Sequence, residues 1–223
     1  MGMNLKPAQQ LNPKGFYEDE DFSKVCAKIW TLYHLQSLNH CTLDHSCLLS
    51  IGEKYKWDFE TLIRHRQNQG NHWGVKEPLL SLLVPVFQQF LSNPFFIVVK
   101  RNIERHVDSR YNKINERFSR QRFAAMFYYL KKGYLFNLLA HVLNNLKSIG
   151  MTKEDMKHLV TSFYILVDSV VMNQPHMYVN FDTLLAQPKH TINGIIAFLS
   201  LAPTREQVEG ALSFIDPNLR HYT

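Results

Sequence analysis

The chain has 223 residues, of which 45% are hydrophobic and 13% aromatic, a composition that allows one sizeable core and predicts a single domain over 1–223, irregular over 1–15. Because the sequence has no run of about eighteen apolar residues and no apolar signal core near its start, we expect a cytoplasmic protein without a membrane span. The net charge of +6 suits a phosphorylated partner, but the basic residues are dispersed, so no nucleic-acid partner is expected.

The first predicted helix follows an acidic run. Apolar residues recur every three or four positions from Phe22 to Leu35, directly after the acids at 18–21, which favour the positive end of a helix. A polar, His-rich interlude over 39–46 comes next and is interpreted as a helix end and loop. The elements expected after it are a helix over 58–69 capped by Asp58, a short strand over 73–76, and a helix over 79–91 that begins after Pro78.

Five apolar residues, Phe95–Val99, run directly into cations. The run is too short for a helix and rich in β-formers, which predicts a strand buried on both faces of a parallel sheet. Ligands of open parallel sheets bind beyond the carboxyl ends of the strands, so Arg101 should lie at that rim, with Ser109 on a helix that begins nearby. A guanidinium and a hydroxyl can hold a phosphate monoester. The alternative is that Arg101 is solvated or caps a carbonyl and that Ser109 is an ordinary surface residue.

The second half of the chain alternates helices with one more short strand. Helices are expected over 122–149, over 153–171 with Thr152 as cap, over 189–201, and from Thr204, where Gln207 completes a capping box. A strand over 177–180 should break into a turn and helix at Asp182. Short apolar strands among longer helices predict an α/β fold, a parallel sheet with helices on both faces.

Several motifs, taken in order, resemble those of bacterial sulfotransferase-like proteins. The strand FIVVKRN and Ser109, eight residues after Arg101, are similar to the segment with which sulfotransferases grip the 3′-phosphate of 3′-phosphoadenosine 5′-phosphosulfate. The family usually has Arg-x-Pro there, whereas Asn102 and Ile103 follow the arginine in this chain. NPKGFYEDEDF, WGVKEPLL, VNFDTLLAQPKHTINGIIAFLSL and FIDPNLRHY are similar to further family segments, so the resemblance runs from about Asn12 to His221.

This resemblance implies a P-loop NTPase-like sulfotransferase fold that moves a sulfuryl group from 3′-phosphoadenosine 5′-phosphosulfate to a hydroxyl or amine of a small-molecule or glycan acceptor. The implied cofactor-binding residues are Arg101, Ser109 and Arg220. The implied catalytic residues are Lys76, which would balance developing negative charge, and Glu77, which would act as the base, with His72 as an alternative base.

Ordinary structural roles remain open for several of these residues. Lys76 and Glu77 would also fit a strand-end ion pair and a helix N-terminal acid before Pro78. Asp182 matches an acid of the family motif, but a role as N-cap of the following helix is the preferred interpretation. Arg220 lies so near the end of the chain that simple solvation would also explain it.

One family feature is missing from the sequence. Sulfotransferases normally begin with a strand and a GxxRSGTS loop that cradles the 5′-phosphosulfate, and no such segment is present. We therefore expect a helix-rich, N-terminally truncated version of the fold that binds the nucleotide weakly and transfers little sulfate. The alternative is a non-catalytic binding or interaction protein that keeps only the 3′-phosphate half-site. Strand backbone left unpaired by the truncation would also favour a homo-oligomer.

The cysteines and histidines raise a metal alternative. Cys26, Cys41 and Cys47 form no paired framework and are expected to be free thiols. Imidazole and thiolate groups at His34, His40, Cys41, His45 and Cys47 are the kinds of ligand that zinc prefers. Their spacing does not form a pair-and-pair pattern, so no metal is expected.

Overall fold

The computed structural model describes residues 19–36, 43–69, 73–116 and 152–215. Within these ranges the strands are β1 (Phe96–Lys100) and β2 (His176–Asn180). The helices are α1 (Glu20–Gln36), α2 (His45–Glu53), α3 (Lys56–Gln69), α4 (Leu80–Phe87), the short 3-10 helix η1 (Gln88–Phe90), α5 (Ile103–Glu116), α8 (Lys153–Val171), α9 (Phe181–Ala186), α10 (Pro188–Phe198) and α11 (Arg205–Phe214). Among the helices so described, none combines the length and the apolar character needed to cross a membrane.

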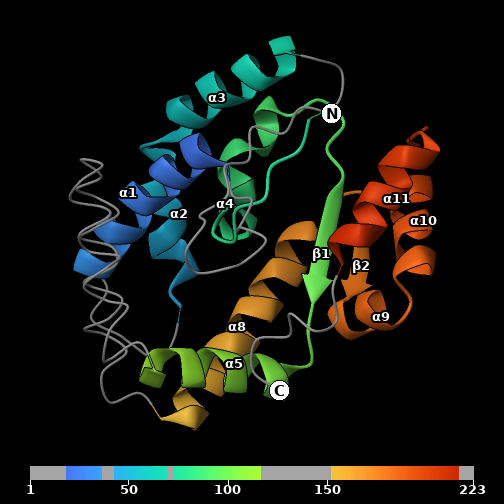
Figure 1. Cartoon of the computed structure of the whole chain (residues 1–223). Helices are drawn as coiled ribbons and strands as arrows, with labels where there is room; N and C mark the ends of the chain where they lie inside the picture. Colours follow the sequence, from blue (N-terminus) through green and yellow to red (C-terminus); the bar gives the residue numbers. More distant parts are fainter. Residues whose placement is uncertain (1–18, 37–42, 70–72, 117–151, 216–223) are drawn as a thin grey trace.

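Helices α1 to α4 gather on one side of β1, and α9 to α11 lie on the other (Figure 1). The inner faces of α1 to α4 share one cluster of buried side chains, which includes Phe22, Ile29, Leu48, Phe59, Ile63, Leu82 and Leu83. Val98 of β1 and Val167 of α8 belong to the same cluster. This core therefore joins the N-terminal helices to β1 and α8.

The helices predicted after the acidic run, over 153–171 and from Thr204 are confirmed, while the helix predicted over 122–149 lies outside the described residues. Helix α2 begins at His45, inside the His-rich interlude, so the interpretation of this part as a helix end and loop is wrong. Asp44 caps α2 by accepting a hydrogen bond from the Cys47 amide at 3.0 Å. Asp58 lies in the first turn of α3, so its prediction as the cap is wrong. The helix predicted over 79–91 is divided into α4 and η1.

The predicted strand over 73–76 is wrong. These residues form neither a helix nor a strand, and they do not join the two-stranded sheet that the structure describes. Trp73 packs on Phe22 of α1, with ring centroids 6.4 Å apart, and Val75 also contacts the core. Side-chain packing against α1, in place of a backbone ladder, fixes this segment.

The two strands form the parallel pair that the sequence predicts. The register runs from Phe96 opposite His176 to Lys100 opposite Asn180. Helix α8 covers one face, where Asp168 accepts hydrogen bonds from Lys100 and Tyr178. Helix α10 covers β2 on the other face, since a methyl group added to Gly194 would lie 3.2 Å from Met177. The described part of the chain is therefore a helix-rich α/β arrangement with helices on both faces of a small parallel sheet.

Strand β1 is less buried than predicted. Val98 is buried, but Ile97 and Val99 on the opposite face are 38% and 53% exposed. The expectation that this strand is buried on both faces is wrong, because α10 lies over β2 and leaves the β1 half of that face open.

The cap of α8 is the clearest local confirmation. The Thr152 hydroxyl accepts from the Asp155 amide at 3.1 Å, while the Asp155 carboxylate accepts from the Thr152 amide at 2.9 Å. Replacing Thr152 by alanine should lower the free energy of unfolding by about 0.5–2 kcal/mol, because one amide at the helix start loses its acceptor. Urea denaturation would measure the loss. Ser169→Ala, an exposed change within α8, is the control and should alter stability by less than about 0.5 kcal/mol.

Candidate functional site

A pocket of about 540 Å³ lies where the carboxyl ends of β1 and β2 meet the start of α5. Three parts of the chain line it. They are the β1–α5 junction (Lys100, Arg101, Asn102, Ile103 and Glu104), one face of α8 (Thr161, Tyr164, Ile165 and Asp168), and Asn180 at the end of β2. The pocket therefore occupies the rim at which parallel sheets ordinarily bind ligands.

Arg101 stands at the junction between strand and helix. Strand β1 ends at Lys100, and the Asn102 side chain accepts a hydrogen bond from the Arg105 amide at 3.2 Å, which starts α5. Arg101 therefore lies beyond the ladder and before the helix, and it lines the pocket. Its predicted position at the carboxyl rim of the strand is confirmed, as is the nearby helix that carries Ser109.

The Arg101 guanidinium has no acidic partner among the described residues. Its Nε is buried without a hydrogen-bond acceptor, and its central carbon lies 5.5 Å from the centre of the Phe181 ring. Neighbouring cations are paired: Lys100 Nζ lies 2.6 Å from Asp168, and Arg105 Nη1 lies 2.7 Å from Asp182. In this part of the structure Arg101 is thus the pocket cation whose charge is left for an anion.

Asp168 neutralises the other cation of the pocket. Burial alone would raise the pKa of its carboxyl group, but hydrogen bonds from Lys100 and Tyr178 and the charge of Lys100 outweigh burial and lower that pKa. Lys100 also lies over the Tyr178 ring, 4.5 Å from its centre. The ammonium group is thereby held against the protein and contributes little net positive charge to the pocket.

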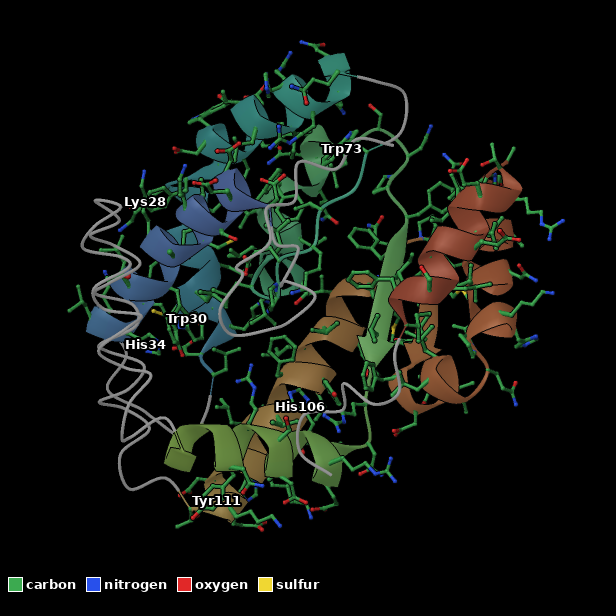
Figure 2. The ribbon with its side chains drawn as sticks, viewed as in Figure 1. Lys28, Trp30, His34, Trp73, His106 and Tyr111 are labelled. Carbon is green, nitrogen blue, oxygen red and sulfur yellow. The ribbon has the colours of Figure 1, made fainter. Side chains whose placement is uncertain are left out.

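His106 and Tyr164 form a polar pair behind Arg101. His106 projects from α5 toward α8 (Figure 2), and its Nδ1 lies 2.8 Å from the Tyr164 hydroxyl oxygen. Burial, and then the charges of Arg110 and Arg101, lower the pKa of His106 to about 4. The imidazole is therefore neutral near pH 7.

The other predicted site residues do not line this pocket. Glu77 accepts a hydrogen bond from the Ser23 hydroxyl of α1 at 2.5 Å and another from the Leu79 amide at 3.2 Å, in agreement with its alternative role at a helix start. Neither Lys76 nor Ser109 is among the described residues that form the walls. The structure therefore brings Arg101 into the pocket without Lys76, Glu77 or Ser109. His72 and Arg220 lie outside the described residues.

Asp182 does not cap the helix that follows β2, so that prediction is wrong. Asn180 is the N-cap of α9 and accepts from the Thr183 amide at 3.0 Å. Asp182 instead pairs with Arg105 of α5. The structure thus ties β2 and α9 to the start of α5, next to the pocket.

The residues of the metal alternative are used in packing where they are described. Trp30 and His34 lie together on α1 (Figure 2), and their ring centroids are 4.5 Å apart. His45 Nε2 lies 2.8 Å from the Leu82 carbonyl oxygen. Cys26 and Cys47 are free thiols, as predicted, while His40 and Cys41 fall outside the described ranges. Across the described chain, no three His, Cys, Asp or Glu side chains are grouped to hold a metal.

The sequence predictions include none of the pocket residues contributed by α8. Thr161, Tyr164, Ile165 and Asp168 are spaced at i, i+3, i+4 and i+7, which places them on one face of a helix. That spacing was a usable signal for a shared face. It could not indicate that this face meets the end of β1.

Comparison of the chain with models of known protein families, with curated proteins and with solved structures found no match. The functional inference therefore rests on the pocket and on the sequence motifs.

Proposed function

We propose that the chain binds a 3′-phosphorylated adenosine nucleotide through Arg101 and uses 3′-phosphoadenosine 5′-phosphosulfate to sulfate a hydroxyl or amine of a small-molecule or glycan acceptor. The observation that supports this proposal is Arg101, which lines a pocket at the ends of two parallel strands and whose guanidinium has no acidic partner in the described structure. The resemblance of FIVVKRN and the following helix to the sulfotransferase motif supplies the identity of the nucleotide. A P-loop NTPase-like fold is part of the same proposal.

The chemistry of the pocket suits one phosphate group. A guanidinium is permanently charged and offers forked N–H donors that match phosphate oxygens. The amides at the start of α5, next to Arg101, add positive potential from the helix end. The side chains of Asn102 and Asn180 in the same wall are neutral, and its two carboxylates, Asp168 and Glu104, are paired with Lys100 and Lys157.

A second candidate function is nucleotide binding without transfer. Sulfuryl transfer needs a base near the acceptor and cations around the leaving phosphate. The Glu77 carboxylate, implied as the base, is engaged by Ser23 and Leu79 outside the pocket. This observation favours a binding or interaction protein that recognises the nucleotide and performs no chemistry on it.

Calorimetric titration with adenosine 3′,5′-bisphosphate tests the binding site. Arg101→Ala should weaken binding by about 1.5–3 kcal/mol, the usual contribution of a hydrogen bond to a charged group. Arg105→Ala is the matched control. It also removes one arginine, four residues farther along the chain, but the guanidinium of Arg105 is already paired with Asp182. It should change affinity far less. Equal affinities of the wild type and Arg101→Ala would show that Arg101 does not bind the nucleotide. Equal losses in Arg101→Ala and Arg105→Ala would show that only the net charge of the protein matters.

A transfer assay separates the two candidate functions. The protein would be incubated with sulfur-labelled 3′-phosphoadenosine 5′-phosphosulfate and a mixture of phenolic, amine and sugar acceptors. Label on an acceptor, lost in Arg101→Ala, supports the transferase. Calorimetric binding without labelled acceptor supports the binding protein.

A further inference from the structure

Helix α8 holds the main chain of Arg101 through the phenol of Tyr164. The Arg101 amide donates a hydrogen bond to the Tyr164 hydroxyl oxygen at 3.2 Å, and that oxygen lies 3.4 Å from the Arg101 carbonyl oxygen. The ladder between the strands stops one residue earlier, at Lys100 opposite Asn180. Tyr164 therefore supplies the contact that the sheet no longer gives at Arg101.

The donors and acceptors around the phenol give His106 a role. Tyr164 has one hydroxyl hydrogen, and its oxygen already accepts from the Arg101 amide. The nearest acceptor for that hydrogen is His106 Nδ1 at 2.8 Å, since the Arg101 carbonyl is farther away. The hydrogen thus goes to His106 when Nδ1 is unprotonated, and the phenol oxygen keeps a lone pair directed at the Arg101 amide.

The surroundings of His106 favour this neutral form. Burial is the largest effect against its protonation, followed by the charges of Arg110 on α5 and Arg101 at the junction, and Tyr164 faces it from α8. The nearby lysines of α8 are paired with acids of α5: Lys153 contacts Asp108, and Lys157 contacts Glu104. Described groups around the imidazole therefore oppose a positive charge on it.

We infer that Tyr164 and His106 are positioning residues for Arg101: the phenol fixes the arginine's main chain beyond the strand end, and the imidazole fixes the phenol. The inference rests on the proposed function, in which the guanidinium of Arg101 binds phosphate. A guanidinium meets phosphate through two directed hydrogen bonds, so a shift of its main chain reduces binding even when its charge is unchanged. Neither positioning residue needs to touch the ligand.

Removal of one hydroxyl tests the first step. Tyr164→Phe should weaken adenosine 3′,5′-bisphosphate binding about three- to tenfold, the value of one lost hydrogen bond. Tyr178→Phe is the matched control, because its hydroxyl bonds to Asp168 at 2.9 Å and does not contact Arg101. The control should bind within about twofold of the wild type. Unchanged affinity of Tyr164→Phe, or an equal loss in the control, would overturn the inference.

A pair of His106 variants separates positioning from packing. His106→Asn offers a carbonyl oxygen near the place of Nδ1 and should bind within about twofold of the wild type, whereas His106→Leu fills similar space, accepts no hydrogen bond and should bind about three- to tenfold more weakly. The ratio of wild-type to His106→Asn affinity should be constant at neutral pH and fall as His106 becomes protonated near pH 4. Titration of the phosphate cancels in that ratio. If both variants lost the same affinity and the ratio did not depend on pH, packing of the His106 side chain would explain the loss, and its proposed role would be wrong.

Hydrogen exchange keeps the test independent of nucleotide binding. The Arg101 amide should exchange about three- to tenfold faster in Tyr164→Phe than in Tyr178→Phe, because only the former loses its acceptor. If the wild type binds no adenosine bisphosphate and the exchange still accelerates, the proposed function fails and the positioning of Arg101 stands. If the exchange rate does not change, the inference fails whether or not nucleotide binds.

Discussion

Replacing Arg66 by methionine should lower the free energy of unfolding by about 3–5 kcal/mol. The Arg66 side chain of α3 is 8% exposed, and its Nη2 lies 3.0 Å from a carboxylate oxygen of both Asp19 and Asp21. Asp19 directly precedes α1, and Asp21 lies in its first turn. Asp19 is itself buried, so removal of the guanidinium leaves a carboxylate without its counter-charge inside the protein. The unpaired charge costs much more than the attraction between two surface ions.

Arg64→Met provides the comparison on the same helix. Arg64 also bonds to an acid, Glu60, at 2.6 Å, but its side chain is 72% exposed. Its loss should change stability by about 0.5 kcal/mol, the value of a helical ion pair one turn apart, because the Arg64 guanidinium stays in water although the Glu60 side chain is 16% exposed. Urea denaturation of Arg66→Met and Arg64→Met shows whether the loss of stability comes from the burial of the arginine or from its pairing with an acid. Similar losses in the two would contradict the buried position of Arg66.

Phe59→Ala should lower the free energy of unfolding by about 3–5 kcal/mol. The Phe59 side chain is 0% exposed, and its ring centre lies 6.3 Å from that of Phe22 and 5.3 Å from that of Phe87. Truncation would leave a cavity between α1, α3 and α4, where the core joins three helices.

Thermal and urea denaturation would measure this loss against Trp57→Ala. Trp57 is the larger aromatic residue, two positions earlier on α3, but it is 62% exposed. Its truncation should cost less than about 1 kcal/mol. A loss of the same size in both variants would show that the helix, and not the core position, determines the cost.

Local signals in the sequence predicted the elements whose ends are marked by side chains. Thr152 and Asp155 mark the start of α8, and Thr204 and Gln207 mark the start of α11 through the same reciprocal bonds. The strand that ends in cations was also recognisable, because an apolar run of that length has few alternatives. Helix α2 was missed because its first residues are polar and its stability comes from burial of Leu48 and Ile51.

Which segments pair, and which side chains contact each other, was less predictable from the sequence, because both depend on residues that are distant along the chain. Arg101 could be placed from its own strand, whereas the contact of Tyr164 with Arg101 joins residues 63 apart in sequence. The family resemblance predicts that Glu77 is the catalytic base. In the structure its carboxylate accepts a hydrogen bond from Ser23 of α1, 54 residues away. No periodicity within either segment contains this information.

The parallel register also affects the order in which the protein folds. Phe96 pairs with His176, so each rung of the ladder closes a loop of about 80 residues. Contacts this distant in sequence form slowly compared with the turns of α3 or α8, because the chain loses much of its freedom before the first rung forms. We therefore expect Asn180 to reach its place beside Arg101 late in folding. A nascent or partly unfolded chain can have all of its helices and still lack the pocket.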